Sequence, residues 1–243
     1  MPTHKEIYAS HATQYEALVS CEDYQGNILA AIQKIVPPEN LDVIDLGAGT
    51  GRLASLLAPL VRRMLAFDLS PHMLRVGREK LRSGRNNSRW LAAAADHRCL
   101  PLAGSSADLI VGGWSVSYVA TWHPDSWRSE LDAWLSEARR VLRQNGRIIL
   151  LESLGTGNEA PQRLPHLENF YDWVERAGFA AGWIRTDYRF QSLAAAEQLA
   201  GFFFGEQMLP SIRRAPEITL PECTGVWWMQ VGQGAPAGGG RAA

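Results

Sequence analysis

The chain has 243 residues, 46% of them hydrophobic, which is enough for one large α/β domain with its own core. Its 24 basic and 25 acidic residues give a formal net charge of -1, and the basic residues occur as short pairs such as Arg62-Arg63. This balance argues against a strongly basic surface for binding nucleic acid.

The cysteines and the first residues give no sign of an exported or membrane protein. The three cysteines are odd in number and far apart, so they suggest neither a disulfide framework nor a metal site. Residues 1–6 lack the apolar segment of a secretory signal, and the uncharged stretch 109–121 is too short and too polar to span a bilayer. We therefore expect a cytoplasmic protein with no metal and no membrane contact.

Two amphipathic helices are predicted between residues 4 and 36, and Pro37-Pro38 ends the second before the first strand. Tyr8 and Tyr15 lie on the apolar face of the first helix, which is consistent with simple packing. Residues 1–38 form the first segment of the predicted organisation.

A glycine-rich turn follows the first predicted strand. Val43 and Ile44 begin a short apolar run typical of a buried strand, and leucines return at helical spacing from Leu53. Between them stands the segment Asp45-Leu46-Gly47-Ala48-Gly49-Thr50-Gly51. Glycine lets the backbone approach a ligand, and the free N–H groups of the first helical turn point at it. The segment therefore predicts an element that holds a nucleotide or an anion.

The residues of the turn discriminate between two kinds of ligand. A dinucleotide site requires glycine at the sixth position from Gly47, where this chain has Arg52. The Asp45 carboxylate would repel a pyrophosphate but suits a cationic ligand. The segment resembles the signature of the class I S-adenosylmethionine-dependent methyltransferases, and a nicotinamide dehydrogenase is the least favoured alternative.

The resemblance implies that S-adenosylmethionine is the cofactor and that the turn binds it through Asp45, Gly47, Ala48, Gly49 and Gly51. In that family the N-terminal helices fold over the cofactor as a lid. The spacing of Tyr8 and Tyr15 is similar to an aromatic-x-x-x-Ala-x-x-Tyr pattern found there, so packing and cofactor contact both remain open for these residues.

The second predicted strand, residues 64–68, ends in Asp68, which lies 68 − 47 = 21 residues after the first glycine of the turn. In nucleotide-binding α/β folds an acid near this distance accepts hydrogen bonds from the ribose hydroxyls. Ser70 is a good N-cap for the helix that follows. The resemblance adds Leu69 and Met73 to the predicted cofactor contacts.

The third predicted strand, residues 89–94, is followed by Asp96 and His97. The resemblance implies that Asp96 accepts a hydrogen bond from the adenine amino group and that the His97 backbone N–H donates to the ring. The imidazole of His97 needs no catalytic role for this, and an ordinary surface histidine remains the alternative.

The fourth predicted strand, residues 107–113, leads into Trp114, Ser115 and Tyr118. In open α/β sheets ligands bind beyond the carboxyl ends of the strands, where the chain order reverses, so this segment should lie beside the cofactor. A long helix over 131–142 follows, and Gly146 should close it in a left-handed conformation. The fifth strand, 147–152, ends in Glu152.

The remaining pattern predicts a loop over 153–165, a helix over 167–177, a strand over 183–190, a helix over 193–208 and a strand over 226–231. Seven strands alternating with helices predict an α/β fold with a doubly wound sheet. The resemblance adds the order 3-2-1-4-5-7-6, with the last strand antiparallel. We expect one S-adenosylmethionine-binding Rossmann-like domain over 39–232, no second domain, and a disordered tail over 233–243.

A sulfonium compound already carries an activated methyl group, so the protein mainly has to position donor and nucleophile. Aromatic faces suit the sulfonium charge. The aromatic candidates are Tyr8, Tyr15, Trp114, Tyr118, Trp122 and Tyr171, the last better explained by packing. Of these, Tyr15, Trp114 and Tyr118 are the predicted catalytic residues, and Glu152 and His123 are candidate general bases.

Three functions stay open. The first is methyl transfer to a small-molecule acceptor, which yields S-adenosylhomocysteine. The second is cyclisation of S-adenosylmethionine alone, in which its amine attacks the γ-carbon to give azetidine-2-carboxylate and methylthioadenosine. The third is a non-catalytic protein that only binds S-adenosylmethionine. The acceptor and the oligomeric state are not readable from the residues.

Overall fold

The computed structural model describes residues 4–83, 90–214 and 217–232, and the tail predicted over 233–243 lies outside them. Seven strands form one sheet in the order β3-β2-β1-β4-β5-β9-β6. They are β1 Asp42–Leu46, β2 Arg63–Asp68, β3 Trp90–Ala94, β4 Ala107–Gly113, β5 Leu142–Thr156, β6 Ala180–Arg185 and β9 Glu222–Gln230. Only β9 runs antiparallel to its neighbours, which confirms the predicted fold class and strand order.

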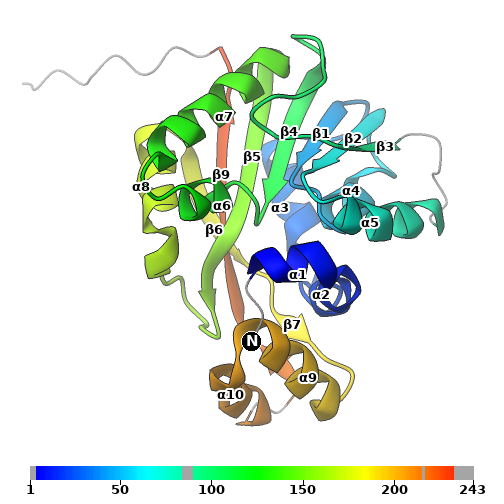
Figure 1. Ribbon diagram of the computed structural model, residues 1–243, viewed down its shortest axis with the longest axis vertical. Helices are drawn as coiled ribbons and strands as arrows, with labels where there is room; N and C mark the ends of the chain where they lie inside the picture. Colours follow the sequence, from blue (N-terminus) through cyan, green and yellow to red (C-terminus); the bar gives the residue numbers. More distant parts are fainter. Residues whose placement is uncertain (1–3, 84–89, 215–216, 233–243) are drawn as a thin grey trace, which may run out of the picture.

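Helices cover both faces of the sheet (Figure 1). On one face lie α3 Asn27–Ile35, α4 Arg52–Leu57 and α5 Pro71–Ser83, and on the other lie α6 Ser117–Trp122, α7 Trp127–Val141 and α8 Glu168–Arg176. Strand β1 is buried along its whole length, with Val43 in the core of one face and Ile44 in the core of the other. This alternation is why the central strands read as continuous apolar runs.

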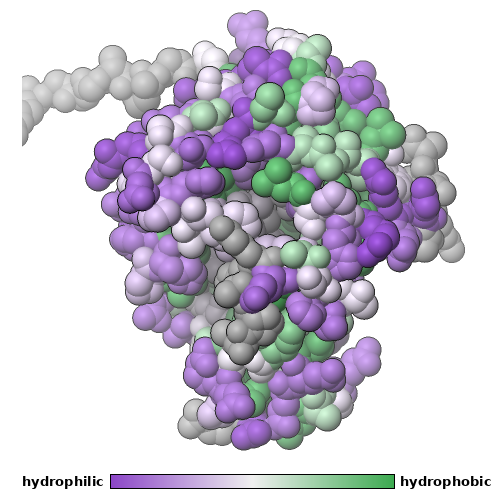
Figure 2. Space-filling view, in the orientation of Figure 1, coloured by the Kyte–Doolittle hydropathy of each residue, from purple (hydrophilic) through white to green (hydrophobic). Residues whose placement is uncertain are grey.

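The helix α7 shows how its sequence pattern directs packing. Its buried residues follow the i, i+3, i+4, i+7 spacing of an amphipathic helix, and Trp134 at their centre is fully buried. The outer side of α7 and α8, at the left of Figure 2, carries mainly hydrophilic residues. No helix among the described residues is long and apolar enough to cross a bilayer.

Two predictions around β5 were wrong. The helix α7 ends at Val141, because Leu142 is already extended and pairs with Ala107 of β4. Gly146 therefore lies inside β5, and the residue with a left-handed backbone is Asn145, at φ +65°. The predicted loop from residue 153 is a continuation of β5, which pairs with β9 as far as Thr156.

The N-terminal segment consists of three helices rather than two, α1 His4–Ser10, α2 Ala12–Val19 and α3. The backbone of His11 is not helical, with φ -122° and ψ 32°, and it separates α1 from α2. The first two helices lie against α5, beside the carboxyl edge of the sheet (Figure 1).

The stretch between β6 and β9 also differs from the prediction, because it forms a small unit with its own core. The predicted strand 183–190 splits at Thr186 into β6 and β7 Tyr188–Arg189, which pairs with β8 Thr219–Leu220 in a separate sheet. The predicted helix 193–208 is α9 Leu193–Phe204, the short 3-10 helix Glu206–Met208 and then α10 Leu209–Arg214, because Gly205 breaks it at φ +90°. Leu18 of α2 packs into the core of this unit, which hangs below the main sheet (Figure 1).

Candidate active site

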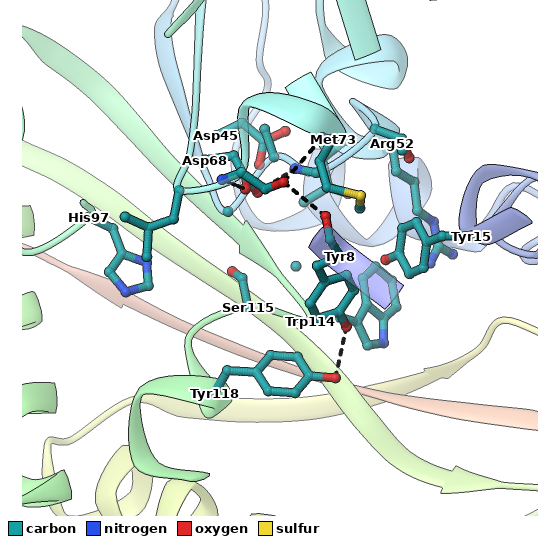
Figure 3. A pocket seen from close by; sticks show the side chains of 18 of the residues that line it. Tyr8, Tyr15, Asp45, Arg52, Asp68, Met73, His97, Trp114, Ser115 and Tyr118 are labelled. Atoms are coloured by element: carbon teal, nitrogen blue, oxygen red, sulfur yellow. Dashed lines mark hydrogen bonds between the residues drawn. The ribbon is translucent and has the colours of Figure 1, made fainter. Parts of the chain in front are cut away.

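A cavity opens at the carboxyl ends of β1, β2 and β4, where doubly wound folds bind their ligands (Figure 3). It encloses about 900 Å³, its open mouth included, which is the size of a small-molecule site. Its lining combines the glycine turn, the ends of three strands and the N-terminal helices. The lining residues are Tyr8, Tyr15, Asp45, Gly47, Ala48, Gly49, Thr50, Arg52, Leu53, Asp68, Leu69, Ser70, Met73, Ala95, His97, Gly113, Trp114, Ser115, Tyr118 and Trp122.

The glycine turn needs glycine for two different reasons. Gly47 has φ +72°, and a Cβ there would lie 2.2 Å from the Cβ of Ser115, so only a residue without a side chain fits. Gly51 also has a positive φ, at +78°, but it does not line the cavity. Its Cα faces α5 instead, where an added Cβ would come within 3.5 Å of the Gly77 Cα. One glycine shapes the cavity and the other permits helix packing.

Asp45 and Asp68 both line the cavity and both hold the turn. Asp45 is 1% exposed and accepts a hydrogen bond from the Ala54 N–H at 3.0 Å. Burial raises the pKa of Asp45 to about 7, and the nearby Asp68 adds to this. The Asp68 carboxylate accepts from the Gly49 N–H at 2.8 Å and from the Ser70 N–H at 2.7 Å, and burial raises its pKa as well. The region between the two acids favours a cationic or hydroxyl-bearing ligand.

Asp96 and His97 are neighbours in the chain, but only His97 lines the cavity. The Asp96 carboxylate faces Arg98, whose guanidinium binds it at 2.6 Å and lowers its pKa to about 2. Arg98 is held in turn by Glu130. His97 does line the cavity, and burial lowers its pKa to about 4, so its imidazole is neutral at pH 7.

Aromatic side chains from the N-terminal helices and from α6 close the other side of the cavity (Figure 3). The Tyr8 hydroxyl donates a hydrogen bond to the Tyr118 hydroxyl at 2.9 Å. The ring of Tyr8 meets that of Tyr15 edge to face at 5.5 Å, and the rings of Tyr118 and Trp122 lie 4.9 Å apart. Burial raises the pKa of both Tyr8 and Tyr118, so their hydroxyls remain protonated at neutral pH.

Arg52, at the start of α4, is a site residue that the sequence patterns did not indicate. Its Nη1 donates to Glu22 at 2.7 Å, and its guanidinium carbon lies 3.9 Å from the centre of the Trp114 ring. The second terminal nitrogen, Nη2, is buried and has no hydrogen-bond partner among the described residues. A cation directly after the last glycine of the turn was the signal that could have revealed it.

Several contacts fasten the N-terminal helices over the cavity. The Ser70 hydroxyl donates to the backbone carbonyl of Tyr8 at 2.9 Å, and Lys80 of α5 pairs with Glu16 of α2 at 2.8 Å. The Ala12 N–H also lies 3.4 Å from the His72 Nε2. The loop after β2 and the helix α5 therefore position the aromatic wall.

A second cavity of about 700 Å³, open space included, adjoins the first and shares five lining residues with it: Tyr8, Tyr15, Arg52, Trp114 and Tyr118. Glu152, which follows the last residue of β5 that pairs with β4, lines this second cavity and is 4% exposed. Burial raises its pKa to about 7. The other lining residues are Leu18, Val19, Glu22, Ser117, Ser153, Thr156, Leu164, His166, Leu167, Tyr188, Phe203 and Phe204.

Most residues predicted for the site come together in these two cavities, but three do not. Gly51, Asp96 and His123 line neither cavity, and His123 lies half-buried just beyond the last residue of α6. The first cavity further contains residues that sequence reasoning missed, namely Thr50, Arg52, Leu53, Ser70, Ala95 and Gly113. Among the described residues, no group of three or more His, Cys, Asp and Glu is arranged to hold a metal ion.

Comparison with known proteins is consistent with this geometry. Residues 43–146 match the model of a family described as a methyltransferase domain. A malonyl-[acyl-carrier protein] O-methyltransferase of Hahella chejuensis is 32% identical over 146 residues, which cover 59% of this chain and 47% of that protein. The ubiquinone/menaquinone biosynthesis C-methyltransferase UbiE of Rubrivivax gelatinosus is 29% identical over 121 residues, 50% of this chain and 43% of that protein. The chain thus spans about half the length of these curated relatives.

Solved structures agree at the level of the fold. The crystal structure of a SAM-dependent methyltransferase from Aquifex aeolicus has a TM-score of 0.53 at 16% identity, covering 83% of this chain and 88% of that chain. The sheet order and the glycine turn at its carboxyl edge define a Rossmann-like nucleotide-binding protein. Together with the match over residues 43–146, they make this chain similar to the class I S-adenosylmethionine-dependent methyltransferases, whose cofactor is S-adenosylmethionine.

Proposed function

We propose that the protein transfers a methyl group from S-adenosylmethionine in the first cavity to a small-molecule acceptor in the second. The observation that carries this proposal is the shared wall, because Tyr8, Tyr15, Trp114 and Tyr118 line both cavities. Two adjoining sites with one boundary suit a reaction between two bound molecules. The relatives named above differ in acceptor and in the atom methylated, so the acceptor is inferred from the second cavity alone.

The residues of the first cavity fit the chemistry of the cofactor. Arg52 has a buried nitrogen without a hydrogen-bond partner among the described residues, and this nitrogen suits the carboxylate of the methionine part. Asp45 would hold the ammonium group, and Asp68 would accept from the ribose hydroxyls. Leu69 is apolar yet 57% exposed at the cavity, where it would cover one face of the adenine ring together with His97.

When bound, S-adenosylmethionine supplies a methyl group on a positively charged sulfur, already activated toward nucleophiles. The contribution of this chain is to orient the two molecules and to exclude water, which can lower the barrier by several kcal/mol. The aromatic wall presents ring faces to the positive charge. Glu152 can accept a proton from the acceptor, because its raised pKa of about 7 lies close to neutral pH.

A second candidate function is cyclisation of S-adenosylmethionine without an acceptor. It is favoured by the hydrogen bond between the Tyr8 and Tyr118 hydroxyls, which joins two residues of the wall between the cavities. A wall closed in this way would keep an acceptor out of the first cavity. The reaction would then be an intramolecular displacement that yields azetidine-2-carboxylate and methylthioadenosine.

Mass spectrometry of the nucleoside products separates these functions. The protein is incubated with S-adenosylmethionine alone and then with candidate acceptors. S-adenosylhomocysteine formed only with an acceptor supports methyl transfer, whereas methylthioadenosine formed without one supports cyclisation. Cofactor binding by calorimetry with no product under either condition would show a non-catalytic binding protein. If neither S-adenosylmethionine nor S-adenosylhomocysteine binds, then methyl transfer, cyclisation and non-catalytic binding are all contradicted.

A further inference from the structure

The second cavity contains one acidic side chain without a counterion. The charged residues on its lining are Glu22, Arg52 and Glu152, and the first two form an ion pair of 2.7 Å with each other. None of the ion pairs among the described residues includes Glu152. His166 also lines the cavity, and burial lowers its pKa, so it is neutral at pH 7. When Glu152 is ionised, the cavity therefore has a net charge of one negative unit.

The groups that face Glu152 come from several elements, and none of them is a cation. Tyr8 on α1, Tyr118 on α6 and Tyr171 on α8 are close enough for the Glu152 charge to raise their pKa values. Glu22, after α2, raises the pKa of Glu152 itself. The Ser153 N–H donates to the Glu152 carboxylate at 3.0 Å, and a hydrogen bond from the Ser117 side chain also lowers the pKa of Glu152. These two neutral donors satisfy only part of the hydrogen-bonding capacity of the carboxylate.

A buried carboxylate is costly unless a cation or hydrogen-bond donors face it. The wall shared with the first cavity carries the rings of Tyr8, Tyr15, Trp114 and Tyr118 beside Arg52, and aromatic faces attract cations. We infer that the second cavity takes an amine as its acceptor, held as an ammonium ion between Glu152 and the tyrosine rings of the shared wall. This inference rests on the proposed function, methyl transfer between the two cavities.

Methyl transfer to this ammonium ion releases one proton overall. The bound ammonium ion passes a proton to the Glu152 carboxylate, which frees the nitrogen lone pair. That lone pair forms the new N–C bond with the donated methyl group as the C–S bond of the donor breaks, and the sulfur keeps the electron pair. The nitrogen regains its positive charge, the donor loses its own, and Glu152 releases the proton to solvent.

Other acceptor classes suit the cavity less well. A carboxylate would add a second negative charge beside Glu152, because Arg52 pairs with Glu22 through Nη1 and its Nη2 is assigned to the carboxylate of the cofactor. An alcohol is neutral and would leave Glu152 without a counterion. The structure therefore favours an amine, whose ammonium form balances the negative charge of Glu152.

The test compares three probes that share a phenylethyl skeleton and differ in the head group: 2-phenylethylamine, 2-phenylethanol and 3-phenylpropanoate. Their binding to protein saturated with S-adenosylhomocysteine is measured by calorimetry. We expect the amine to bind about 10- to 100-fold more tightly than the alcohol or the carboxylate, as for a charge-assisted contact. Incubation with S-adenosylmethionine should convert the amine to its N-methyl product.

The variant Glu152→Gln should abolish the preference for the amine and leave the affinity for S-adenosylhomocysteine unchanged. The matched control is Glu39→Gln, because Glu39 is exposed and lies outside both cavities. Equal or tighter binding of the alcohol or the carboxylate to the unmodified protein would overturn the inference, as would an amine preference that survives in Glu152→Gln.

The comparison of probes on the unmodified protein does not depend on the folding of any variant. Failure of the inference is also distinct from failure of the proposed function. Protein that binds S-adenosylhomocysteine but shows no amine preference refutes only the inference. Protein that binds no S-adenosylhomocysteine refutes the proposed function.

Discussion

The ion pair between Arg52 and Glu22 makes a quantitative prediction, because both partners are removed from water. The side chain of Glu22 is 2% exposed and that of Arg52 is 14% exposed, with 2.7 Å between Nη1 and Oε2. The change Arg52→Met removes the cation and leaves the carboxylate buried and unpaired. We expect the free energy of unfolding to fall by about 3–5 kcal/mol, the usual cost of breaking a buried pair from one side. Such a loss is a large share of the about 5–15 kcal/mol that stabilises a typical domain.

The assay is urea unfolding followed by circular dichroism, run as a double-mutant cycle. The double variant Arg52→Met with Glu22→Leu should recover stability to within about 1 kcal/mol of the unmodified protein, because it removes both charges. The control is Arg213→Met, which breaks a pair with Glu197 of similar length, 2.6 Å, whose side chains are 54% and 34% exposed. That change should cost less than about 1 kcal/mol. If Arg52→Met costs no more than this control, the pair is not buried in solution and the reasoning fails.

Three further predictions concern the glycine turn, the attachment of α1 and the buried acid of the second cavity. Gly47→Ala should destabilise the protein by about 2–4 kcal/mol and abolish binding of S-adenosylhomocysteine in calorimetry, because the new methyl group clashes with Ser115; normal binding would refute the close approach. Ser70→Ala should cost about 1 kcal/mol in urea unfolding, because it removes a helix cap and the hydrogen bond to the Tyr8 carbonyl; an unchanged midpoint would contradict this. Folding raises the pKa of Glu152 from 4.5 to about 7, so the folded protein binds the proton of Glu152 more tightly than the unfolded chain does. The stability that this proton contributes is complete below pH 4.5 and is lost as the pH rises to 7. The free energy of unfolding is measured by urea at several pH values. In Glu152→Gln its decrease with pH between 4.5 and 7 should be smaller by up to about 1.4 kcal/mol per pH unit, and an unchanged decrease would refute the raised pKa of Glu152.

The parts of the fold that follow from backbone geometry were predicted from the sequence. Gly47 marks a turn because a positive φ and the contact with Ser115 exclude a side chain. The sequence predicts that Asp45 and Asp68 lie near each other, because the carboxyl ends of parallel strands share one edge of the sheet. Strand order followed from the family resemblance rather than from the residues themselves.

Contacts of individual side chains were not predictable in this way. Asp96 stays a predicted contact of the adenine ring, and no sequence pattern indicated that the guanidinium of Arg98 binds its carboxylate. Glu22 reaches the site because it forms a β-bridge with Tyr188, which is far away in the sequence. Both residues line the second cavity and lie far apart in the chain, so no local pattern could reveal that cavity.

The unit between β6 and β9 supplies part of the second cavity, so changes in this unit would alter that cavity. Its residues Tyr188, Phe203 and Phe204 complete the second cavity, yet none of them lines the first. The strand ends and the glycine turn lie on a different part of the chain. An exchange of this unit for one of another shape would therefore change the lining of the second cavity directly and would reach the first only through Tyr15, whose ring lies 5.8 Å from that of Phe203. The strand ends and the glycine turn would keep their shape while the second cavity changes.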